Sequence, residues 1–117
     1  MILGEDEEEI LSEKLGDGEF RGRNFKNMVV YLTDRRLVVE GEEGGGLMSD
    51  ATTATVIDTG LQNIRNVTAN SGGLLSKEKV VLELDLEDAN GFPKLPIPNV
   101  DAEKWKREVE QAVSKVT

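Results

Sequence analysis

The strict alternation of apolar and polar side chains over residues 79–87 restricts the fold more than any other feature of the sequence. One parity is aliphatic and the other is mostly acidic: Val80, Leu82, Leu84 and Leu86 alternate with Val81, Glu83, Asp85 and Glu87. A period of two is typical of a β-strand that buries one face and exposes the other. A strand of this kind needs partner strands and an apolar layer to pack against, so we expect a mainly β fold.

Further strands are expected where β-branched and aromatic residues cluster between turn signals. Besides a mixed stretch over 10–15, the expected extended segments are 19–25, 28–33, 36–41, 53–59, 64–70, 79–87 and 92–97. Prolines in the last of these cannot donate ladder hydrogen bonds, which places it at an edge. In 64–70, Ile64 and Val67 do not share a period of two, which predicts a bulge or a partly exposed strand.

Turn signals separate these segments. Gly16-Asp17-Gly18 is expected to break the chain after the mixed stretch, and Thr33-Asp34-Arg35 to form a tight turn. Residues 42–50 contain three consecutive glycines and predict a loop, and Asn90-Gly91 predicts a hairpin turn.

One amphipathic helix is expected at residues 101–116. Asp101 is a suitable N-cap. The apolar residues that follow recur at spacings of three and four: Trp105, Val109, Ala112, Val113 and Val116. They form one stripe, so roughly seven strands precede a single helix that buries one face.

Two missing residue types limit the chemistry. The 117 residues suit one domain, and they include no Cys and no His. Disulfides, thiolate metal sites, Ser-His-Asp catalysis and the common zinc sites are therefore excluded. The acidic run 83–88 lacks the ligand spacing of a calcium loop. We expect no cofactor, no metal and no catalytic residues.

The net charge of −9 is unevenly distributed, because residues 1–13 hold six acids and no base. We expect an acidic N-terminal segment at 1–9 and a single domain at 10–117. Whether that segment is mobile or packs onto a basic patch is open at this stage. The acidity argues against a nucleic-acid partner. The start of the chain turns acidic at once, unlike a signal peptide, so a cytoplasmic location is expected.

Four segments of the chain resemble the GRAM-like and prokaryotic PH-like domains, members of the pleckstrin-homology superfold. Residues 31–39, Tyr-Leu-Thr-Asp-Arg-Arg-Leu-Val-Val, are similar to their LTxxRL hairpin. Residues 57–67, 72–77 and 101–116 are similar to their middle strands, a hairpin loop and the closing helix. The resemblance implies a seven-stranded antiparallel, partly open barrel that one C-terminal amphipathic helix closes.

The resemblance also implies a candidate ligand site on the first hairpin. PH domains that bind inositol phosphates carry a Lys followed by a basic-x-Arg pair, and Lys14, Arg21 and Arg23 show that spacing, with Lys26 close by. Guanidinium groups can hold a phosphate through forked hydrogen bonds. The alternative is that these are ordinary solvent-facing strand residues.

A second candidate surface is the loop at 71–77. Leu74 and Leu75 lie beside Lys77 and Lys79, a combination that suits contact with an anionic membrane or a partner. The alternative is that both leucines fold over the end of the barrel. Arg35 and Arg36 are expected to pair with Asp34, with Glu40 or with the acidic N-terminus.

Three functional hypotheses follow. The first is a non-catalytic binding module that acts in protein–protein interaction or self-assembly, with a homo-oligomer as one outcome. The second is an adaptor, peripheral at the membrane, that binds anionic lipid through Leu74, Leu75 and nearby basic residues. The third is an enzyme whose site uses carboxylates alone.

Overall fold

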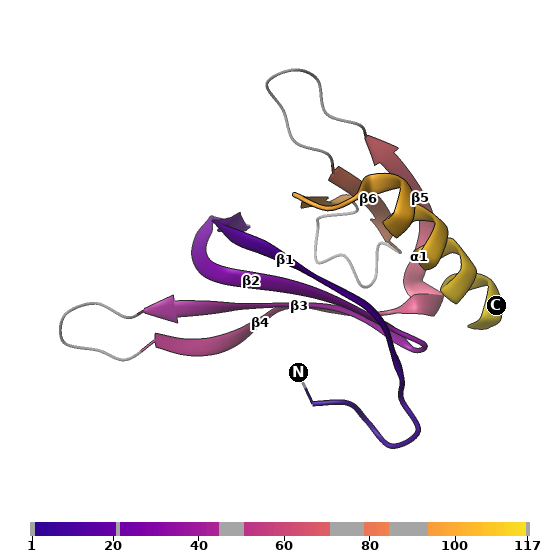
Figure 1. Cartoon of the computed structure of the whole chain (residues 1–117), viewed down its shortest axis with the longest axis horizontal. Coiled ribbons are helices and arrows are strands. Elements are labelled where there is room, and N and C mark those ends of the chain that lie inside the picture. Colours follow the sequence, from indigo (N-terminus) through magenta and orange to yellow (C-terminus); the bar gives the residue numbers. More distant parts are fainter. Residues whose placement is uncertain (1, 21, 45–50, 71–78, 85–93, 117) are drawn as a thin grey trace.

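The computed structural model describes residues 2–20, 22–44, 51–70, 79–84 and 94–116 (Figure 1). The elements follow the chain as β1 (Glu9–Phe20), β2 (Arg23–Thr33), β3 (Arg36–Gly44), β4 (Ala51–Gly60), the 3-10 turn η1 (Leu61–Asn63), β5 (Ile64–Asn70), β6 (Lys79–Leu84), β7 (Lys94–Pro98) and α1 (Ala102–Val116). The expectation of roughly seven strands followed by one helix is confirmed in number. The extended segment expected at 19–25 is wrong, because β1 ends at Phe20 and β2 begins at Arg23 within it. The Asn90-Gly91 turn lies outside the described residues.

The strands form two antiparallel sheets. The first has the order β1-β2-β3-β4 and the second the order β5-β6-β7. The tight turn expected at Thr33-Asp34-Arg35 joins β2 to β3, and the pair Leu32 and Leu37 sets the register beside it. The register of β5 on β6 shifts between Ile64 and Asn66, which confirms the bulge expected there.

Other strand boundaries also differ from the expectation. Gly16 was expected to break the chain, yet β1 runs through it, because Gly16 adopts a φ of 81° where the β1–β2 register shifts. Glycine takes that conformation without steric cost, so it produces a bulge in the strand and not its end. β3 continues to Gly44, past the expected end at residue 41, because Glu42 and Glu43 pair with β4.

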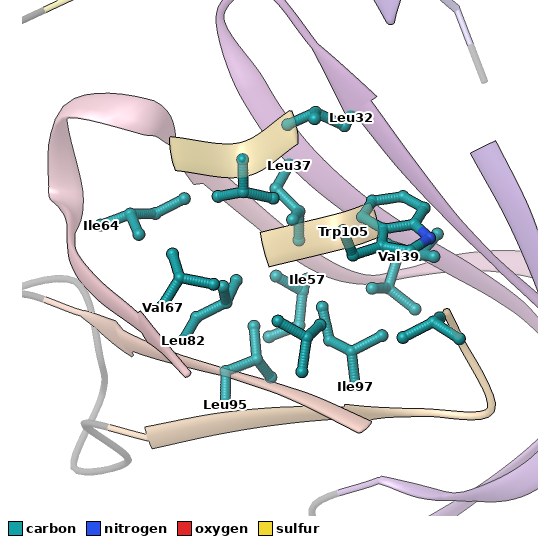
Figure 2. Packing of buried hydrophobic residues seen from close by; sticks show 14 of the residues in the cluster. Leu32, Leu37, Val39, Ile57, Ile64, Val67, Leu82, Leu95, Ile97 and Trp105 are labelled. Carbon is teal, nitrogen blue, oxygen red and sulfur yellow. The ribbon is translucent and has the colours of Figure 1, made fainter. Parts of the chain in front are cut away.

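The core lies between the two sheets (Figure 2). The inward side chains come from alternate strand positions, as the period of two predicts. Residues with no more than 2% exposure include Leu32, Leu37, Val39, Leu82, Leu95, Ile97 and Trp105.

The helix packs mainly against the second sheet, with contacts to β5, β6 and η1. Asp101 caps it as expected, because its Oδ1 accepts a hydrogen bond from the Lys104 amide at 3.3 Å. Trp105 is fully buried, and its Nε1–H donates to the Glu13 carboxylate on β1. This contact ties the helix to the first sheet as well.

The partly open barrel that the resemblance implies is not formed, because the two sheets stay separate. β7 has five residues, of which Pro96 and Pro98 lack the N–H that a ladder bond needs. Directly after β7, Asn99 Nδ2 donates a hydrogen bond to the Leu15 carbonyl of β1 at 2.9 Å. The prolines therefore leave the sandwich open along this side. No helix in the described part of the chain is long and apolar enough to cross a bilayer.

Candidate functional site

The acidic N-terminal segment is held against the β2–β3 hairpin by one buried carboxylate. The Glu7 side chain is only 3% exposed and forms a two-point ion pair with Arg36, Nε to Oε2 at 2.9 Å and Nη2 to Oε1 at 3.1 Å. Thr33 Oγ1 donates to Glu7 Oε2 at 2.7 Å, and the Gly4 amide donates to Oε1 at 2.7 Å. These contacts form a clasp, defined here as Glu7, Thr33 and Arg36.

The turn itself is built to hold this clasp. The Thr33 hydroxyl accepts hydrogen bonds from the amides of Arg35 at 3.1 Å and Arg36 at 3.0 Å. Asp34 and Glu8 exchange two further bonds between the turn and the segment. Residues 32–36 therefore have two roles: they form the turn, and they bind the N-terminal segment. The C-terminal end of α1 comes near the segment, because Val116 lines the same depression as Gly4 and Glu7.

The clasp shifts the titration of its groups. Hydrogen bonds from Arg36 lower the pKa of Glu7 to about 2, against a smaller opposing effect of burial. The same pairing raises the pKa of Arg36. Arg36 also reaches Asp58 Oδ2 through Nη1 at 2.8 Å and the Ile2 carbonyl through Nη2 at 3.0 Å.

An open depression of about 630 Å³ surrounds Arg36. Its guanidinium is shared between two carboxylates, so little positive charge is left for an outside anion. The arrangement pairs Arg36 with the acidic N-terminus, as one of the expected alternatives had it. We interpret it as a structural contact that orders the segment.

A second hollow, of about 510 Å³, opens between β1 and β7 where the sandwich is not closed. We call it the β1–β7 groove. Its walls are largely apolar and come from both sheets: Leu15, Phe20, Met28, Val39, Pro96, Ile97 and Pro98. The prolines that prevent strand pairing also line the groove, so the same residues open it and make it apolar.

Charges of both signs lie at the rim of the β1–β7 groove. Asp17 and Glu19 are exposed on the β1 side, and Lys79 and Lys94 are exposed on the second sheet. A mixed rim around an apolar floor is typical of a surface that binds another protein segment, with an apolar side chain as its anchor. A rim of lysines alone would suit an anionic headgroup better.

The phosphate site expected on the first hairpin is not assembled by its described members. Lys14 lies opposite Val29, six positions along β2 from Arg23, which is about 20 Å at the rise of a strand. Arg23 forms an ion pair with Glu43 and lies 5.5 Å from the Phe25 ring centroid.

Lys26 pairs in register with Glu42, on the other strand face from Arg23. Arg21 lies outside the described residues. Two acidic residues of β3, Glu42 and Glu43, therefore lie beside Lys26 and Arg23 and offset their positive charge.

The second candidate surface is described only at its end. Leu74, Leu75 and Lys77 lie outside the described residues. Lys79 begins β6, is exposed and belongs to the rim of the β1–β7 groove.

Comparison with known proteins supports a PH-like fold. The sequence matches no protein-family profile and no curated protein. Among solved structures, the chain is similar to a Vps36 N-terminal PH domain, with a TM-score of 0.61 and 14% identity over 98% of this chain and 85% of that one. At this identity the likeness establishes the fold alone. The narrower GRAM-like assignment stays a prediction.

A fold by itself does not determine a function. Two features of the surface escaped sequence reasoning. Glu7 stands in a run of five consecutive acids, and nothing local distinguishes it from its neighbours. The β1–β7 groove depends on two sheets that do not close, and only the prolines of β7 signalled that.

Proposed function

We propose that this chain is a non-catalytic, GRAM-like module of the PH-like fold that acts in the cytoplasm through protein–protein interaction or self-assembly. The observation that carries the proposal is the β1–β7 groove, an apolar hollow of about 510 Å³ on a chain of strong net charge. An exposed apolar hollow of this kind is more often a binding surface than a packing defect.

Two further observations favour a protein partner over lipid. The rim combines Asp17 and Glu19 with Lys79 and Lys94, which suits a segment bearing both charge signs. On the first hairpin, Arg23 is paired with Glu43, and so is less available to a phosphate.

Pull-down from an extract of the native host tests the role of the groove. Phe20 is half-buried in the wall, so Phe20→Ser removes an apolar contact. We expect it to weaken binding of the captured protein by about tenfold or more. Ile10→Ser is the matched control, because Ile10 is 39% exposed and does not line the groove.

The fluorescence of Trp105, the one tryptophan of the chain, checks that both variants are folded. Equal capture by wild type and Phe20→Ser, or loss of capture in Ile10→Ser as well, would contradict the role of the groove.

The second candidate function is a membrane-surface adaptor that uses Leu74, Leu75 and nearby basic residues. The observation in its favour is the position of Lys79, which is exposed at the groove rim and follows both leucines by a few residues in the sequence. Lys94 lines the same rim. In this alternative the two lysines would face anionic headgroups.

A further inference from the structure

The four outer strands of the two sheets differ in how well they are protected from pairing with another chain. An outer strand offers unpaired backbone N–H and C=O groups, and proteins usually protect it with charges, prolines, bulges or a covering element. Here the outer strands are β1 and β4 in the first sheet and β5 and β7 in the second.

Three of these strands carry such protection. β1 has register shifts around Gly16 and several acidic side chains, among them Glu13 and Glu19. β5 contacts α1 and carries Arg65. β7 has five residues, two of which are prolines.

β4 lacks these protections over most of its length. Residues 51–57, Ala-Thr-Thr-Ala-Thr-Val-Ile, contain no charge, no proline and no glycine. Thr52, Thr53 and Thr55 are exposed, and their β-branched type favours extended pairing. In Figure 1, β3 and β4 extend together away from the second sheet, so α1 does not cover this part of β4.

We propose that β4 pairs antiparallel with β4 of a second copy of this chain, so that two four-stranded sheets join across a twofold axis. This rests on the proposed function and names self-assembly as one of its forms. The argument for a second copy is that this outer edge carries no charge of its own. Residues 51–57 are neutral in both copies, and the nearest acids, Glu40, Glu42 and Glu43, lie on β3, one strand away from the pairing edge.

The neutral stretch is also complementary to itself. In an antiparallel pair, threonines and alanines of one copy lie opposite threonines and alanines of the other, and Thr–Thr pairs are favourable cross-strand neighbours. The bulge of β4 near Val56 lies at the end of this stretch. The regular register from Ala51 to Thr55 is therefore the part available for pairing.

Sedimentation of the full chain over a range of concentrations tests the pairing. We expect a dimer, and we expect Thr53→Lys combined with Thr55→Lys to weaken it by about tenfold or more, because lysine on an outer strand opposes pairing. The control is Asn66→Lys combined with Thr68→Lys, which adds the same charge at two exposed alternate positions of β5. Both double variants add positive charge and so reduce the general repulsion between copies. A loss of the dimer in the β4 variant alone therefore reports on the outer edge of β4.

A cysteine variant supplies a second readout, because the natural chain contains no Cys. We expect Thr53→Cys to form a covalent dimer with a short thiol crosslinker, and Thr68→Cys to stay monomeric. A chain that is monomeric at every concentration, or an oligomer that the β4 lysines leave intact, would overturn the pairing. Neither result would alter the Phe20→Ser pull-down, so the two proposals fail independently.

Discussion

At the scale of single residues, the most consequential contact is the ion pair between Glu7 and Arg36. Glu7 is one of five consecutive acidic residues, yet its carboxylate accepts hydrogen bonds from Arg36, Thr33 and the Gly4 amide. The Glu7 side chain is only 3% exposed, but its partner Arg36 is 28% exposed, so solvent screens the ion pair. The clasp therefore orders the N-terminal segment without dominating the stability of the domain.

Glu7→Gln tests this account of the clasp. The amide keeps the shape and loses the charge, so we expect the free energy of unfolding at neutral pH to fall by about 1–3 kcal/mol. Urea denaturation measures the change. Glu5→Gln is the control, because Glu5 is exposed and we expect a change within about 0.5 kcal/mol.

The pH dependence of the same variant gives the sign of the effect. The pKa of Glu7 is lowered from 4.5 to about 2 in the folded state. Its contribution is therefore complete above pH 4.5 and is lost as the pH falls towards 2. The stability difference between wild type and Glu7→Gln should shrink over that interval. A difference that stays constant down to pH 2 would contradict the ion pair.

At the scale of elements, the helix α1 joins the two sheets through Trp105. The indole is fully buried, and its N–H reaches Glu13 on β1. We expect Trp105→Ala to lower the free energy of unfolding by about 3–5 kcal/mol through loss of packing. Trp105→Phe, which keeps an aromatic ring, should cost clearly less.

Thermal denaturation followed by circular dichroism measures both variants, because neither retains a tryptophan. Replacing the exposed Lys104 with Ala supplies the control within the same helix, with little expected change. Equal stability of Trp105→Ala and wild type would show that α1 is not part of the cooperative core.

Most elements could be predicted because their patterns are local. The period of two in β6 and the three-to-four spacing of α1 follow from which face of each element is buried. The continuity of β1 through Gly16 could not be predicted, because a glycine signals a turn and a bulge equally. The opening between β1 and β7 depends on how two sheets meet, and the prolines of β7 are the one local pattern that indicates it.

Strand pairing also separates the described members of the candidate phosphate site. Spacing along the chain placed Lys14 and Arg23 in one motif, but strand pairing separates them along β2. Glu43, which pairs with Arg23, comes from the neighbouring strand β3, so the local sequence around Arg23 does not indicate it.

At the scale of the whole molecule, charge and apolar surface are distributed separately. The acidic excess is concentrated in residues 1–13, and Glu7 directs part of it onto Arg36. The β1–β7 groove and the neutral part of β4 lie outside residues 1–13. Two surfaces suited to association are therefore present on a strongly acidic chain. The proposed function rests on this separation.

Flotation with vesicles that contain anionic phospholipid tests most directly whether the β1–β7 groove serves protein or membrane. At low salt, where electrostatic attraction is strongest, we expect the wild-type chain to stay unbound, as should Lys79→Glu combined with Lys94→Glu. Flotation of the wild type that weakens with salt and is lost in the double variant would contradict the account and support the membrane adaptor.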